Sequence, residues 1–298
     1  MSSSPPLVSI ITVNYNSANE TTAFVESLLL ADYTHWELFI VDNGSVSFDG
    51  AAFRSMDPRI TVIESAVNLG FAGGNNLALE HCSGAYLFYV NNDTILEADT
   101  ISQLVRTAVS TKNLGGVSPK VLYFHSPGVI EYAGCTQVNM LTGRNRSIGY
   151  GEKDDNAHSS LISTSYLHGC AMLLPMEIIR QVGPMDEDFF LYYEELDWCE
   201  RIRRCGRNIF CEQRARIHHK ESASVGRVSP LKVFYMTRSR LLFMWRNFSL
   251  IELMPFTVFF VLVSLPKNSF LFLVKGQWRH FTAFIRGIKG VFNPLARY

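Results

Sequence analysis

The sequence predicts an α/β fold in which helices cover both faces of a mostly parallel sheet, followed by C-terminal amphipathic helices. Two observations carry this prediction. In the first half, short and nearly continuous apolar segments alternate with helix-like segments, as in parallel sheets covered on both faces. From residue 229 on, long apolar runs instead mix with basic and aromatic residues. At 298 residues, the chain has the length of one or two domains.

The predicted elements follow one another in a regular order through the first half. Four apolar segments are predicted strands: Leu7–Val13, Trp36–Val41, Ile60–Glu64 and Ala85–Val90. Three segments have helical periodicity: Glu20–Leu30, Phe71–His81 and Ala98–Ser110. Beyond Gly115 the pattern loosens. There we predict extended pieces at Val121–Phe124, Val129–Tyr132, Tyr166–Leu174, Ile209–Cys211 and Ala215–His218, and helices at Met176–Gln181 and Glu194–Cys205.

The composition excludes several classes of protein. Hydrophobic residues make up 47% of the chain and charged residues 18%, which rules out a disordered chain or a collagen. No secretion signal is visible at the N-terminus, so we expect a reducing cytoplasm. Cys199, Cys205 and Cys211 recur every six residues, which is not the spacing of a zinc site. We therefore expect all six Cys to be free thiols.

Charge is distributed unevenly although the net charge is zero. Residues 1–200 hold 24 Asp and Glu against nine Lys and Arg, and residues 201–298 hold 18 Lys and Arg against three Asp and Glu. The apolar stretches Ile251–Leu265 and Phe270–Val274 are each too short to span a bilayer, which takes about 20 residues. Apolar and aromatic faces beside basic residues favour helices that lie on an anionic membrane, although a hairpin packed on the main domain or a re-entrant pair fits as well. The basic residues are Arg238, Arg240, Arg246, Lys267, Lys275, Arg279, Arg286 and Lys289.

Three polar segments follow predicted strands, where sheets of this kind bind ligands. Asp42-Asn43-Gly44-Ser45 offers a carboxylate to a base or a ribose, or is simply a turn. The glycines of residues 68–76 let a backbone approach a ligand at a helix start, but match neither GxGxxG nor a P-loop. Asn91-Asn92-Asp93-Thr94 offers one carboxylate and amide oxygens to a divalent cation, whose coordination a diphosphate and water would complete. The alternative is that this segment is an Asx turn.

Two further clusters lie in the second half. Residues 186–198 place six carboxylates beside aromatic residues. Glu194, Asp197 and Arg201 share a helical face, and Glu195 points about 100° away. Such surroundings raise the pKa of a carboxylate toward that of a general base, although acids at a helix start also stabilise the helix. His218 and His219 end a predicted strand, so their side chains should point to opposite faces.

These segments, in this order, resemble the family 2 inverting glycosyltransferases, and most closely the bacterial rhamnosyltransferase-like members that build cell-surface polysaccharides. The resemblance covers residues 7 to about 245 and implies a GT-A fold, a nucleotide-diphosphate sugar donor, Mg²⁺ or Mn²⁺, and single displacement with inversion. The matching stretches are VSIITVNYN (8–16), LFIVDNGS (38–45), NLGFAGGNN (68–76), YVNNDT (89–94), HGCAMLLP (168–175), DEDFFLYYEELDWCERIRRCG (186–206), HHKESAS (218–224) and FYMTRSRLLF (234–243).

The resemblance also implies a role for particular residues. Those assigned to the nucleoside and the donor are Thr12, Asn14, Asp42, Asn43, Gly70, Gly73, Asn76, Asn91 and Asn92. Asp93 and His219 are assigned to the metal and the diphosphate, and Glu195 falls where the family has its base. Gly169, Trp198 and His218 are assigned to the acceptor or to supporting roles. Two departures matter: Asn91 and Glu195 stand where many relatives have Asp, which leaves Glu194 and Asp197 as alternative bases.

The resulting interpretation is a catalytic domain over residues 1–228, with a nucleotide-binding half (1–115) and an acceptor half (116–228), and a membrane-associating region over 229–298. We expect transfer from a nucleotide-diphosphate sugar, dTDP-rhamnose before UDP-sugars, to a lipid-linked glycan on the inner face of the plasma membrane. The alternatives are a non-catalytic membrane partner that binds nucleotide or glycan, and a sugar nucleotidyltransferase. The second would need a basic phosphate loop where Asn14-Tyr15-Asn16 stands. Nucleic-acid binding is disfavoured because the basic residues alternate with apolar runs.

Overall fold

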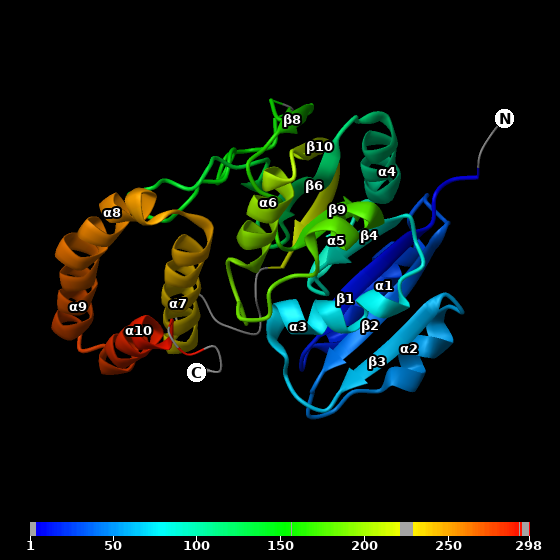
Figure 1. The fold of residues 1–298 in the computed structure, drawn as a ribbon. Helices are drawn as coiled ribbons and strands as arrows, with labels where there is room; N and C mark the ends of the chain where they lie inside the picture. Colours follow the sequence, from blue (N-terminus) through cyan, green and yellow to red (C-terminus); the bar gives the residue numbers. More distant parts are fainter. Residues whose placement is uncertain (1–3, 156, 221–228, 292, 294–297) are drawn as a thin grey trace.

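The computed structural model describes residues 4–155, 157–220, 229–291, 293 and 298. Over these residues, ten strands form one sheet, with the order β3-β2-β1-β4-β9-β6-β10-β5 and with β7 and β8 paired to β6 and β10 (Figure 1). Six strands run in one direction: β1 (Val8–Asn14), β2 (Trp36–Asn43), β3 (Ile60–Ser65), β4 (Tyr86–Val90), β6 (Leu114–Tyr123) and β10 (Asn208–His219). Four run against them: β5 (Thr94–Leu96), β7 (Ile130–Tyr132), β8 (Leu161–Ser163) and β9 (Ala171–Pro175). The mostly parallel sheet is thus confirmed.

Helices cover the sheet on both faces, which explains why its central strands are apolar throughout. β1, β2 and β4 are almost wholly buried, whereas the edge strand β3 alternates between buried and exposed residues. The covering helices are α1 (Ala18–Leu29), α2 (Gly50–Met56), α3 (Gly70–Leu77), the 3₁₀ turn η1 (Leu79–His81), α4 (Thr100–Ser110), α5 (Met176–Val182) and α6 (Glu194–Arg204). Because the six parallel strands run in the same direction, their carboxyl ends lie at one edge of the sheet.

Several elements differ from the sequence prediction. α2 was missed, although Asp49 caps it by accepting a hydrogen bond from the Ala52 amide at 3.1 Å. The strand predicted at Val121–Phe124 is the end of the longer strand β6, which begins at Leu114. The first half of β6 was missed because Gly115, Gly116 and Pro119 interrupt the apolar pattern of the sequence, although they do not end the strand. The two predicted strands at 209–211 and 215–218 form the single strand β10, whose register against β6 shifts between Glu212 and Arg216. Only Ala171–Pro175 of the predicted strand at 166–174 pairs in the sheet.

The C-terminal region contains α7 (Pro230–Asn247), α8 (Leu250–Phe259), the π-helical turn η2 (Phe260–Ser264), α9 (Leu265–Val274) and α10 (Trp278–Gly290). α8, η2 and α9 join into one continuous helix of 25 residues that stands apart from the sheet, with α7 and α10 beside it (Figure 1). The prediction of two separate short stretches is therefore wrong. The helix continues through Pro266, which follows the π-helical turn, where the wider backbone spacing accommodates a residue without an amide hydrogen.

This helix, Leu250–Val274, is long and apolar enough to cross a membrane by length and composition alone. Its most apolar window has a mean hydropathy of 1.8, and only 11% of that window is buried. α10 is amphipathic as expected, since Ala283, Phe284 and Gly287 are buried while Arg286 and Lys289 are exposed.

Three of the basic residues predicted to form a solvated or membrane-facing surface lie elsewhere. Arg238 and Arg240 on α7 are buried, and Arg246 pairs with Asp186 and Asp188. α7 packs against α6 and α10. Arg238 and Arg246 reach the loop before α6, whereas Arg240 lies beside Phe260 of η2. The predicted boundary at residue 228 and residues 221–224 of the matching stretch HHKESAS lie outside the described residues.

Candidate active site

The first group of polar side chains lies at the ends of β1 and β2. Asn14 donates to the Asp42 carboxylate at 2.8 Å and to the Ser45 hydroxyl at 3.0 Å, and Ser45 in turn donates to Asp42. Both strands end at the same level because Asn14 and Asp42 are register partners in the parallel pair. The Thr12 hydroxyl is fully buried and has no hydrogen-bond partner among the described residues. The structure therefore brings Thr12, Asn14 and Asp42 together as predicted.

The glycine-rich segment at the start of α3 connects this corner to the loop before α6. Asn43 donates to the Gly70 carbonyl at 3.0 Å and accepts from the Leu69 amide at 2.9 Å. Gly70 has a φ of +77°, and an added Cβ would lie 2.3 Å from the Phe190 carbonyl oxygen. That carbonyl accepts from the Phe71 amide at 2.8 Å. A glycine is needed here because both the left-handed backbone and the close approach exclude a side chain.

Gly73 and Asn76 lie one turn further along α3. The Asn76 amide group donates to the Met185 carbonyl at 2.8 Å and to Glu187 at 3.1 Å, and accepts from the Met185 amide at 3.2 Å. A Cβ on Gly73 would lie 3.6 Å from the same Glu187 carboxylate. Asn76 thus holds the loop before α6 against α3, and its amide group is already occupied by protein atoms.

The Asn91-Asn92-Asp93 segment follows β4 at the same edge. The Asn92 amide donates to the hydroxyls of Ser17 and Thr21, both at 2.8 Å, and so fixes the segment to the start of α1. The Asn91 backbone amide donates to the Cys170 carbonyl at 2.9 Å. Asp93 lies beside His219, with 3.3 Å between Asp93 Oδ1 and His219 Nε2. Of the three side chains, Asp93 is therefore the one placed with His219.

His219 lies between two carboxylates. Its Nδ1 is 2.8 Å from Glu131 Oε2, and Glu131 Oε1 is 3.9 Å from His168 Nε2. Burial acts to lower the pKa of His219, but the carboxylates of Asp93 and Glu131 outweigh it and raise that pKa to about 10. His218 points to the opposite face and contacts Glu97 at 3.1 Å, as the strand geometry predicts.

Glu131 was missed by the sequence analysis. It lies in the three-residue strand β7, whose pairing with β6 has no signal in the apolar pattern.

The side chains of Asp93 and His219 fit a divalent cation shared with a diphosphate. A carboxylate oxygen is a ligand that Mg²⁺ and Mn²⁺ prefer, and a cation bridging two phosphates needs few protein ligands. The imidazole nitrogen of His219 can become a ligand only when it loses its proton; while protonated, its positive charge suits the diphosphate. No group of three or more His, Cys, Asp or Glu side chains within the described ranges is arranged to hold a metal alone. The donor set therefore suits a cation that arrives with its nucleotide.

Two carboxylates begin α6 after a strained turn. Tyr192 and Tyr193 have φ values of 67° and 70°, which are unfavourable for residues with side chains and often mark functional sites. Burial raises the pKa of Glu195 to about 7, and burial together with the neighbouring Glu195 raises the pKa of Glu194 well above its usual value. Each has a buried Oε2 without a hydrogen-bond partner among the described residues.

Gly169 places Glu195 at the same edge as the metal position. A Cβ on Gly169 would lie 3.6 Å from the Glu195 carboxyl carbon. Its neighbours are His168, beside Glu131, and Cys170, whose carbonyl accepts from Asn91. The three residues 168–170 thus connect the base position to the segment that carries Asp93.

Asp197 and Trp198 have structural roles, which corrects their assignment as alternative base and acceptor contact. Asp197 is buried, binds Arg201 at 3.0 Å and accepts from Asn247 at 2.8 Å. Trp198 is fully buried, and its indole nitrogen donates to the Gly183 carbonyl at 2.9 Å. Both lie on the face of α6 that packs on the protein.

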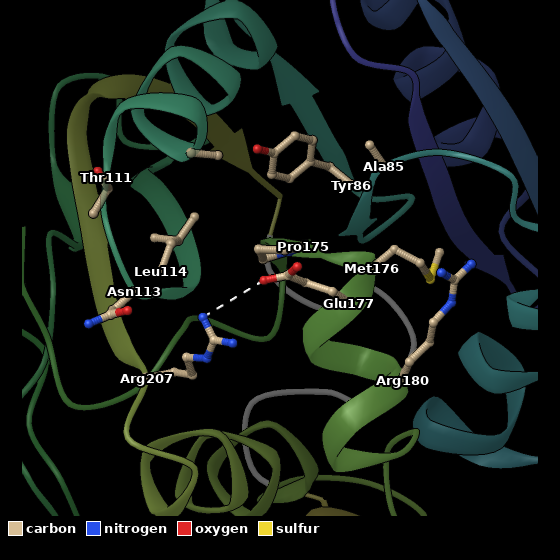
Figure 2. Close-up of a pocket in the computed structure, with 11 residues that line it drawn as sticks. Ala85, Tyr86, Thr111, Asn113, Leu114, Pro175, Met176, Glu177, Arg180 and Arg207 are labelled. Atoms are coloured by element: carbon tan, nitrogen blue, oxygen red, sulfur yellow. Dashed lines mark ion pairs between the residues drawn. The ribbon is translucent and has the colours of Figure 1, made fainter.

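A separate cavity of about 420 Å³ opens at the opposite edge of the sheet (Figure 2). It lies at the amino ends of β4 and β6, near Tyr86 and Leu114, and an ion pair between Arg207 and Glu177 at 3.8 Å crosses it. None of the site residues predicted from the sequence lines it. The candidate active site is therefore the carboxyl edge of the sheet.

The fold is that of the GT-A transferases. Residues 9–183 match the sequence profile described as glycosyl transferase family 2, and the chain belongs to this family. It is 29% identical over 263 residues to the low-salt glycan biosynthesis hexosyltransferase Agl10 of Haloferax volcanii, a match that covers 86% of this chain and 82% of that protein.

Two further comparisons support this assignment. Over 102 residues, the chain is 31% identical to the Escherichia coli UDP-Glc:alpha-D-GlcNAc-diphosphoundecaprenol beta-1,3-glucosyltransferase WfgD, covering 33% of this chain and 40% of that protein. The structure of the mannosyltransferase PcManGT from Pyrobaculum calidifontis, in complex with GDP-Man and Mn²⁺, superposes with a TM-score of 0.60 at 14% identity. That match covers 98% of this chain and 88% of PcManGT. The predicted GT-A fold is thereby confirmed.

Proposed function

We propose that this glycosyltransferase moves a sugar, with inversion, from a nucleotide-diphosphate donor to a lipid-linked glycan in cell-surface polysaccharide synthesis. The observation that carries the proposal is Glu195, a carboxylate whose pKa is raised to about 7 at the same sheet edge as Asp93 and His219. The resemblance favours dTDP-rhamnose as donor, with UDP-sugars next. A lipid-linked acceptor is supported by the name of WfgD, which includes a diphosphoundecaprenol.

In this proposal each part of the edge has one task. Thr12, Asn14 and Asp42 bind the nucleoside, with Asn43 and the glycines of α3 shaping the backbone around it. Asp93 and His219 hold Mg²⁺ or Mn²⁺ with the diphosphate, and this cation, when bound, neutralises charge on the departing diphosphate. Glu195 accepts the proton of an acceptor hydroxyl that attacks the anomeric carbon from the opposite side. The orphaned Oε2 of Glu195 is available for that proton.

The stereochemistry of slow donor hydrolysis tests the proposal without knowledge of the acceptor. With water in place of the acceptor, we expect the first free sugar, followed by proton NMR before mutarotation, to have the anomeric configuration opposite to that of the donor. A first product with the donor's own configuration would rule out single displacement.

We also propose that the enzyme works on the cytoplasmic face of the plasma membrane, docked through the helix Leu250–Val274. Its exposed apolar residues include Ile251, Leu262 and Phe270, and Lys267, Lys275 and Arg279 are exposed nearby. Apolar area beside basic residues suits an anionic bilayer.

A substitution on this helix tests the membrane proposal. Leu262 is 69% exposed, so Leu262→Glu should leave the thermal midpoint unchanged while weakening sedimentation with phosphatidylglycerol vesicles by roughly tenfold or more. The matched control is Leu30→Glu, at a site that is 78% exposed at the end of α1. Equal vesicle binding by wild type and Leu262→Glu would disprove docking through this helix.

A further inference from the structure

Arg240 on α7 is a buried cation that has no acidic partner in the part of the chain that the structure describes. Its side chain is 6% exposed, its Nε is buried without a hydrogen-bond partner, and within the described residues it makes neither a hydrogen bond nor an ion pair. Arg238, two residues earlier, shows the contrast: it donates to the carbonyls of Asp188, Gly290 and Asn293. Only its Nε is among the fully buried atoms, so the terminal nitrogens of the guanidinium group remain accessible to an anionic ligand.

A second arginine lies close to Arg240, because a Cβ on Gly143, which directly precedes Arg144, would lie 3.2 Å from Arg240 Cγ. Arg144 ends the turn Asn139–Arg144 and is exposed. Burial raises the pKa of Tyr193 to about 12, while the positive charges of Arg240 and Arg144 both act to lower it. The field of Arg144 also acts to lower the pKa of Arg240, whose burial lowers it most. Two like charges thus lie near one phenol.

The two arginines lie between the base and the apolar helix. The Tyr193 hydroxyl donates to the Gly143 carbonyl at 2.8 Å, and Tyr193 directly precedes Glu194 and Glu195. On the other side, a Cβ on Gly143 would lie 2.9 Å from Phe256, and the Arg240 guanidinium lies 5.6 Å from the centre of the Phe260 ring. Figure 1 shows the segment around this turn extending from the sheet domain to α8.

We propose that Arg240 and Arg144 bind a phosphate ester group of a lipid-linked acceptor. The phosphate would lie between the helix Leu250–Val274, which holds the lipid chain, and the active site, which holds the sugar. Guanidinium groups match phosphate oxygens in geometry and charge. The exposed apolar side chains of the same helix, among them Met254 and Val258, offer the lipid chain an apolar surface. Because Tyr193 joins this position to Glu195, a sugar attached directly to the phosphate would lie at the base. The inference rests on the proposed function and adds the residues that bind the phosphate of its lipid-linked acceptor.

Calorimetry with farnesyl diphosphate tests this site. The full chain is titrated in EDTA, which removes cations from the donor site, and farnesol and inorganic pyrophosphate are titrated in parallel. We expect wild type to bind farnesyl diphosphate more tightly than either parallel probe. Arg240→Met and Arg144→Met should each weaken that binding by roughly tenfold to a hundredfold, the range of charge-assisted hydrogen bonds. Arg146→Met is the matched control, because Arg146 is exposed and forms only backbone hydrogen bonds.

Two further measurements separate the possible outcomes. Arg240→Met should keep or raise the thermal midpoint, because it removes an unpaired buried charge, whereas a structural arginine would lower it. The variants should bind a nucleoside diphosphate with Mn²⁺ as tightly as wild type does. If wild type itself does not bind a nucleoside diphosphate with Mn²⁺, the proposed function is refuted, not the acceptor site. The acceptor site is refuted if wild type does not bind farnesyl diphosphate or if both variants bind it like wild type. Pyrophosphate binding as tightly as farnesyl diphosphate would overturn the assignment to a lipid-linked acceptor.

Discussion

Glu195→Gln should reduce donor hydrolysis and transfer by about 10²- to 10⁴-fold, the usual contribution of a general base. Glutamine keeps the size of the side chain but cannot accept the proton. Nucleotide binding should remain at its wild-type strength, because Glu195 lies at the acceptor side of the edge, beside Gly169.

The pH dependence of the wild-type rate belongs to the same prediction. A base must be ionised, and the pKa of Glu195 is raised to about 7, so the rate should rise between pH 6 and 8 and then level off. Glu195→Gln should lose this rise. The matched control is Glu194→Gln, which leaves the base in place and should keep most of the rate. If Glu194→Gln is inactive and Glu195→Gln is active, the roles of the two carboxylates are reversed.

Asp93→Ala should lower the Mn²⁺-dependent rate on the order of a hundredfold or more, because metal stabilisation of the transition state contributes several kcal/mol. Asp93 is the carboxylate of its segment that lies beside His219. Raising the Mn²⁺ concentration should restore only part of the rate, since a cation ligand is lost.

The matched control for this variant is Asp32→Ala. Asp32 is exposed in the turn between α1 and β2, and it accepts a hydrogen bond from Ser102. It lies at the edge of the sheet away from the site and should leave the Mn²⁺ response unchanged. An Asp93→Ala variant with a wild-type rate and Mn²⁺ response would place the cation elsewhere.

The sequence could predict the parts of the site that follow apolar strands. Parallel strands end at one edge, so Asn14 and Asp42 had to meet once β1 and β2 were recognised, and the opposite directions of His218 and His219 follow from strand geometry alone. The raised pKa of a carboxylate at the start of α6 followed from its aromatic surroundings. These inferences need only local periodicity and the direction of the strands.

Other parts depend on tertiary packing that has no periodic signal. Glu131 reaches His219 from a three-residue strand, and Arg144 reaches the site from a turn in the loosely patterned middle of the chain. Proximity along the chain also misled: Asp197 and Trp198 are neighbours of Glu195, but they lie on the packed face of α6. The continuous apolar helix was missed because the polar segment 266–269 separates two apolar stretches in the sequence, whereas in the structure the helix continues through it.

The most direct test of the central claim is calorimetric binding of dTDP, UDP and GDP to the purified full chain, each with and without Mn²⁺ or Mg²⁺. We expect one nucleotide to bind only with the cation, and Asp93→Ala to abolish that binding. The nucleotide that binds would also name the donor class. If a folded wild-type protein binds none of the three with either cation, the carboxyl edge of the sheet is not a donor site and the proposed transfer is wrong.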